Sequence, residues 1–167
     1  QLRRAVDSLE RQQREDAANS ERRLDLARAR RDLGHGLLAA GQPGAAVLAQ
    51  RGALDVLQGA AEGRPRGVLE GDVLASLGEA KGAAGRPGEA RDAFERAAAT
   101  LRPLAKDSRD PRVLAPFARA LAEYREGEFV SELEKIRTSL GRDVAFDVDW
   151  ESVTVAGGTP EERLRAI

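Results

Sequence analysis

Apolar residues recur at spacings of three and four along most of residues 21–140, which predicts amphipathic helices. The clearest stripe is made of Ala90, Ala93, Phe94, Ala97, Ala98, Leu101, Leu104 and Ala105. Charged residues occupy the other side of the same stretch, and they are Arg91, Asp92, Glu95 and Arg96. A stripe of this kind buries one face of a helix and leaves the opposite face in solvent.

The helical pattern repeats after 44 residues. Leu33-Gly34 returns as Leu77-Gly78, and the run AAGQPG at 39–44 returns as AAGRPG at 83–88. The first glycine of each G-x-P-G run can end a helix in the left-handed conformation, and the proline presets φ for the next helix. Each unit is therefore predicted to be a helix–turn–helix hairpin.

Three such hairpins are predicted, at about 21–61, 66–106 and 111–140. In the first, a helix to Ala40 precedes one from Gly44, and Asn19 or Ser20 is the expected N-cap. The third is degenerate, with a helix from Asp110-Pro111 and a turn at 126–128. We expect an all-α fold of antiparallel hairpins in a stack, for which three units are about the minimum.

The two ends of the chain have other patterns. Residues 1–18 hold three apolar positions followed by a polar run, which predicts a polar helix or linker, or half of a coiled coil. Beyond Gly141 apolar and polar residues alternate, so residues 142–167 are predicted to form an extended or short β-like tail. Phe146 and Trp150 are its expected anchors on the last hairpin, and Thr159 marks a helix start. Both ends are typical of a piece of a larger protein.

Composition narrows the chemistry that this chain can perform. The absence of Cys excludes disulfides, thiolate zinc sites and cysteine nucleophiles, and the single histidine, His35, argues against metal binding and a Ser-His-Asp triad. We therefore predict no metal, no cofactor and no catalytic residue. The 27 basic and 28 acidic side chains argue against nucleic-acid binding, and no apolar run is long enough to span a membrane. A preference for Arg over Lys, with abundant Ala and Gly, is typical of a GC-rich, bacterial genome.

The order of small and apolar positions resembles the tetratricopeptide repeat over residues 19–141. The matching residues are Leu33, Gly34, Gly41, Ala46 and Ala53 in the first unit, and Leu77, Gly78, Gly85, Ala90, Phe94, Ala97 and Pro103 in the second. That repeat has a period of about 34 residues, so the longer period here implies longer helices and a connector at 62–67. The chain is similar to the long-repeat arrays that lie C-terminal in bacterial eukaryotic-like kinases and winged-helix regulators. The resemblance implies a short solenoid that binds other proteins without catalysis.

In repeats of this type the first helix of each hairpin lines the concave face. Arg28, Arg31 and His35 share one face of such a helix, because their spacings are three and four. The equivalent positions of the second hairpin include Asp72 and Glu79, of opposite charge, and Tyr124 is the candidate from the third. The expected ligand is a protein or peptide of mixed charge, although a solvated helix face explains the same pattern.

Three functions compete on the sequence alone. The leading one is a cytoplasmic, non-catalytic interaction scaffold. The alternative is the sensory or oligomerising region of a larger signalling protein, with self-association through residues 1–18; if an upstream membrane anchor exists, the location is periplasmic. An enzyme is the remote third, because no nucleophile and base are spaced for catalysis.

Overall fold

A computed structural model describes residues 1–15, 19–106 and 108–124 of the 167. These residues form helices and connecting turns without any strand. The helices are α1 (Leu2–Glu15), α2 (Ser20–Ala39), α3 (Pro43–Gln58), α4 (Arg64–Ala83), α5 (Pro87–Ala105) and α6 (Pro111–Tyr124). The prediction of an all-α fold is confirmed for this part of the chain. The predicted helix after residue 126, the tail with Phe146 and Trp150, and the helix start at Thr159 lie outside the described residues.

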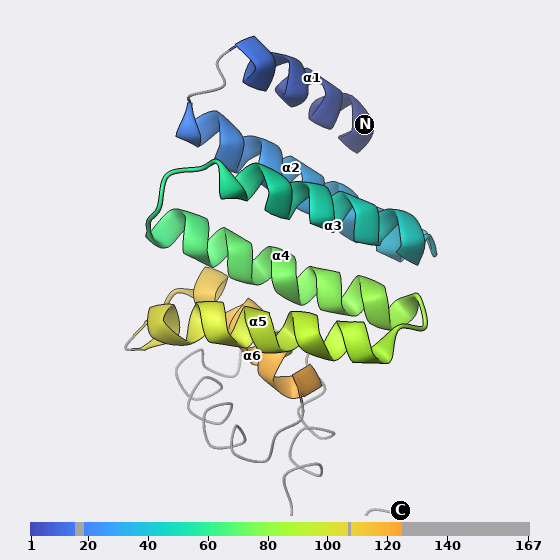
Figure 1. The fold of residues 1–167 in the computed structure, drawn as a ribbon, viewed down its shortest axis with the longest axis vertical. Helices are drawn as coiled ribbons and strands as arrows, with labels where there is room; N and C mark the ends of the chain where they lie inside the picture. The colour runs from blue at the N-terminus through green and yellow to red at the C-terminus, as the bar shows by residue number, and fades with distance from the viewer. Residues whose placement is uncertain (16–18, 107, 125–167) are drawn as a thin grey trace, which may run out of the picture.

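The helices α1 to α5 follow one another along the long axis of the molecule, and α6 crosses behind α5 in the view of Figure 1. Each packs against the next one along the chain, from α1 against α2 to α5 against α6. In addition, α2 contacts α4 and α4 contacts α6. The alternate helices α2, α4 and α6 are therefore neighbours, which brings residues more than 40 positions apart into contact.

Both predicted turns are built as expected. Gly41 and Gly85 have φ of 69° and 73°, in the left-handed region that favours glycine. In the first turn the Gln42 amide donates to the Leu37 carbonyl and the Gly41 amide donates to the Leu38 carbonyl, a Schellman motif. The second turn has the same two bonds 44 residues later. The proline after each turn is the first residue of the next helix, so the G-x-P-G prediction is confirmed.

The repeated glycines at 34 and 78 let the two helices of a hairpin approach closely. A Cβ on Gly34 would lie 2.8 Å from Cδ of Gln50, and a Cβ on Gly78 would lie 2.7 Å from the ring of Phe94. Gln50 and Phe94 are themselves 44 residues apart, so the same packing device occurs once in each hairpin. Within the described residues, the 44-residue period of the sequence therefore corresponds to a repeated contact between the two helices of a hairpin.

The largest cluster of buried residues lies between α4, α5 and α6. Its large members are Leu74, Phe94, Leu101, Val113, Leu114, Phe117 and Leu121. A smaller cluster joins α2, α3 and α4 and includes Leu57, Leu69 and Val73. Another joins α3, α4 and α5 and includes Val47, Leu77 and Ala93. The core is thus a series of local contacts between neighbouring helices.

The N-terminal helix has a partner within the chain. Val6 of α1 is buried, and Glu10 forms an ion pair of 2.6 Å with Arg30 of α2. One face of this polar helix is therefore covered by α2 of the same chain. Asn19 is the N-cap of α2, and its side chain accepts bonds from the amides of Glu21 and Arg22.

Candidate functional site

A groove of about 510 Å³ lies between the alternate helices α2, α4 and α6. Residues of α2, α4 and α6 line it, together with Asp110 just before α6. The lining consists of Arg28, Arg31, Arg64, Pro65, Val68, Leu69, Asp72, Asp110, Pro111, Arg112, Ala115, Pro116 and Arg119. Five arginines against two aspartates make the lining cationic. A volume of this size suits a small molecule or a few residues of a peptide.

Three exposed arginines surround the groove, one from each of the three helices, and we call Arg28, Arg64 and Arg112 the rim. Arg28 pairs with Asp25 at 2.7 Å, and Arg112 pairs with Asp110 at 3.2 Å. Hydrogen bonds from Arg112 lower the pKa of Asp110. Arg64 donates to the Leu104 carbonyl and the Ser108 hydroxyl. Exposed ion pairs contribute little to stability, so a ligand carboxylate can replace them.

The inner part of the groove is apolar. Leu69 and Pro116 are buried, and Val68 and Ala115 are half-buried. We call these four residues the floor. The combination of an apolar floor with a cationic rim fits a segment that carries both apolar side chains and carboxylates.

A network of ion pairs forms one wall of the groove. Asp72 of α4 accepts from Arg31 of α2 and from Arg119 of α6, each at 2.7 Å. Arg119 also pairs with Glu79 at 3.2 Å, and Arg31 pairs with Asp32 at 2.8 Å. Asp72 is 16% exposed, and the two arginines are about one-quarter exposed. The network therefore connects the helices α2, α4 and α6 through one partly buried carboxylate.

Burial and charge oppose each other in this network. Burial alone would lower the pKa of Arg31, but the carboxylates of Asp72 and Asp32 outweigh it, so the pKa is raised and the guanidinium stays charged. For Glu79, burial raises the pKa, and the electrostatic effects of Arg119 and His35 only partly compensate. Burial therefore disfavours the charged form of Glu79.

His35 continues the network to Ser76. Its Nε2 lies 2.6 Å from Oγ of Ser76, and that hydroxyl donates to the Asp72 carbonyl at 2.9 Å. Because the hydroxyl proton is directed at the carbonyl, we assign the hydrogen of this contact to Nε2, with His35 as donor. Ser76 is 1% exposed, so it is out of reach of a substrate in solution.

The structure brings most of the predicted site residues together. Arg31, His35, Asp72 and Glu79 belong to one network, through Ser76 and Arg119. Arg28 lies on the same groove but pairs with Asp25 outside the network. The backbone of Tyr124 ends α6, and its side chain lies outside what the structure describes.

Several residues of this site were not predicted, and they are Arg64, Ser76, Arg112 and Arg119. One signal was available for Arg119, because it lies two periods of 44 residues after Arg31. The spacing between Gly85 and Gly127 is 42 residues, and this offset would instead align Asp72 with Leu114, which is buried in the core. Ser76, Arg64 and Arg112 have no distinctive sequence signal.

Among the residues that the structure describes, no group of three or more His, Cys, Asp or Glu side chains is arranged to hold a metal ion. None of the described helices is long and apolar enough to cross a membrane. No protein family, curated protein or solved structure shows a match to this chain.

Proposed function

We propose that this chain is a non-catalytic interaction module, and that the groove between α2, α4 and α6 binds an acidic, partly apolar segment of a partner protein. The observation that carries the proposal is the groove itself, with five arginines over an apolar floor. In a stack that resembles tetratricopeptide repeats, this groove is the concave face. Three helices contribute to it, so an extended segment can contact several hairpins at once.

The inner arginines and the rim have different roles in the proposal. Arg31 and Arg119 are committed to Asp72, and they hold the wall in shape. The rim arginines Arg28 and Arg112 have exposed partners, so their guanidinium groups are accessible to ligand carboxylates. Arginine suits this role because its planar fork binds a carboxylate through two parallel hydrogen bonds.

The alternative, an oligomerising region that acts through residues 1–18, has weaker support. The apolar face of α1 packs on α2 within the same chain, with Val6 buried. The enzyme alternative is also disfavoured, because the Ser–His contact within the described residues has a buried serine and a histidine that donates. Cytoplasmic location stays a prediction.

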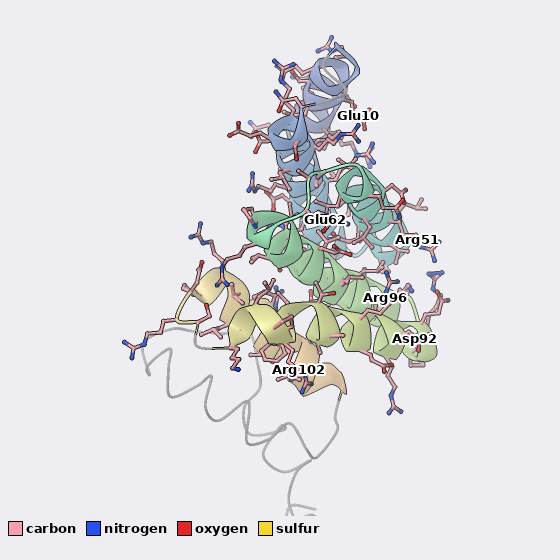
Figure 2. The ribbon with its side chains drawn as sticks, turned by 60° about the vertical axis from the view of Figure 1, so that its left-hand side comes forward. Glu10, Arg51, Glu62, Asp92, Arg96 and Arg102 are labelled. Carbon is pink, nitrogen blue, oxygen red and sulfur yellow. The ribbon has the colours of Figure 1, made fainter. Side chains whose placement is uncertain are left out.

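The test uses a random peptide display library selected on the full chain. We expect enrichment of Asp and Glu next to apolar residues, and about tenfold weaker binding to the double variant Arg28→Glu/Arg112→Glu. The matched control is Arg51→Glu/Arg96→Glu, on α3 and α5, where both arginines are labelled in Figure 2. Neither control residue lines the groove. Selected peptides that lack acidic residues, or that bind the rim variant as tightly as the wild type, would contradict the proposal.

A further inference from the structure

A charge asymmetry divides the chain at the end of α6. Residues 1–124 carry 21 basic and 18 acidic side chains, whereas residues 125–167 carry 6 basic and 10 acidic ones. Two nine-residue stretches in this part carry four carboxylates and no cation, EGEFVSELE at 126–134 and DVAFDVDWE at 143–151. The second has the more apolar residues, because Val144, Phe146, Val148 and Trp150 alternate with its other positions. The structure does not describe this stretch, and its sequence has the composition that the groove is proposed to bind.

We propose that residues 143–151 of this chain occupy the groove as an internal ligand, which an acidic partner segment must displace. This inference rests on the proposed function of the groove, and it adds a specific occupant and a form of regulation. Free groove and occupied groove would be two states of the same molecule.

The alternation within the stretch matches the two sides of the groove. In an extended conformation successive side chains point in opposite directions. The carboxylates at 143, 147, 149 and 151 then share one side, and Val144, Phe146, Val148 and Trp150 share the other. The apolar side fits the floor of Val68, Leu69, Ala115 and Pro116, while the acidic side meets the rim arginines at the mouth.

The chain is long enough for this arrangement. The 14 residues of α6 span about 21 Å, from Pro111 beside the rim to Tyr124. Asp143 follows Tyr124 by 19 residues, which reach at most about 60–70 Å when extended. The stretch can therefore return to the level of Arg112. An intramolecular ligand also has a high effective concentration, so weak individual ion pairs suffice to hold it.

Trp150 is the one tryptophan of the chain, so its fluorescence reports directly on this stretch in the full-length protein. We expect wild-type emission at shorter wavelength than in the unfolded chain, with reduced quenching by acrylamide. In Arg28→Glu/Arg112→Glu the emission should shift to that of an exposed indole, with unchanged helical circular dichroism. The control Arg51→Glu/Arg96→Glu should behave as the wild type. Adding Asp147→Arg/Asp149→Arg to the rim variant should restore protection, since the charges are then exchanged.

Three results would overturn the inference. Wild-type Trp150 emission equal to that of the unfolded chain would show that the stretch is undocked. Protection that survives reversal of the rim would place Trp150 elsewhere on the chain. Protection that is lost on dilution would assign the ligand to a second copy. The peptide selection tests the proposed function separately, because it measures rim-dependent binding of acidic peptides without using Trp150. The internal-ligand inference can therefore fail while the proposed function of the groove holds.

Discussion

The hairpins α2–α3 and α4–α5 share a turn and a helix-packing glycine, but different side chains cover that glycine. In the first hairpin the amide of Gln50 lies against Gly34 and donates to the Arg31 carbonyl at 3.1 Å. In the second, the ring of Phe94 lies against Gly78 within the largest core cluster. The comparison shows that the same close approach of two helix backbones, repeated within one chain, can be covered either by a polar or by an aromatic side chain. The consequences for stability differ, because burial of a ring and burial of an amide have different free energies.

The largest expected effect comes from truncating these two covering side chains. Phe94→Ala should lower the free energy of unfolding by about 3–5 kcal/mol, because a buried ring is lost and a cavity remains. Gln50→Ala should cost about 0–2 kcal/mol, since the amide oxygen of Gln50 is buried without a hydrogen-bond partner in the described structure and its removal offsets part of the loss. Urea unfolding followed by circular dichroism measures both. Equal losses would contradict the distinction between the two hairpins.

The glycines beneath these side chains give the second test. Gly78→Ala should destabilise by about 1–2 kcal/mol, because its Cβ collides with the Phe94 ring and the gain in helix propensity only partly compensates. Gly34→Ala should stay within about 1 kcal/mol of the wild type, because the colliding atoms are the end of a flexible side chain. Thermal unfolding of the two variants side by side checks the order. A larger loss at Gly34 would mean that the Gln50 bond is more important than the ring.

The turns should behave alike, in contrast to the helix interiors. Gly41 and Gly85 have the same left-handed φ, and a Cβ at either meets nothing within 4 Å. Gly41→Ala and Gly85→Ala should each cost about 1 kcal/mol, from backbone conformation alone. Urea midpoints provide the measurement, with Gly88→Ala, in open space and without positive φ, as the control. A difference of more than about 1 kcal/mol between the two turns would show that their surroundings matter.

The smallest expected effect on stability concerns Glu79, in the ion-pair network that forms one wall of the groove. Burial raises the pKa of Glu79 above its ordinary value of 4.5, so the folded chain holds this proton to higher pH than the unfolded chain does. Its contribution to stability is therefore present at low pH and decreases as pH rises from about 4.5 through the folded pKa. Glu79→Gln should remove this contribution to the pH dependence of stability, which urea unfolding midpoints from pH 4 to 7 measure. Glu95→Gln, on the exposed side of α5, is the control; an unchanged profile in Glu79→Gln would contradict the assignment.

Sequence patterns predicted the helices and turns well because these depend on local physics. The G-x-P-G runs need only a left-handed glycine and a proline φ, and Asn19 needs only the first amides of its own helix. The faces of Arg31, His35, Asp72 and Glu79 also follow from helical periodicity. The ion pairs between them do not, because Arg31 meets Asp72 across 41 residues and Arg119 meets it across 47.

The difference between local and distant information explains what each level decides in this protein. The sequence by itself determined which stretches are helical, which face of each is apolar, and where the two G-x-P-G turns lie, because these features depend on residues within a few positions. The predicted connector at 62–67 was too long, because α4 already begins at Arg64, with Pro65 in its first turn. Only the tertiary structure decided that α2, α4 and α6 stand side by side, that Asp72 serves two arginines, and that α1 has a partner in α2. Those pairings join residues 20 to 47 positions apart, so they form only when the helices pack against one another.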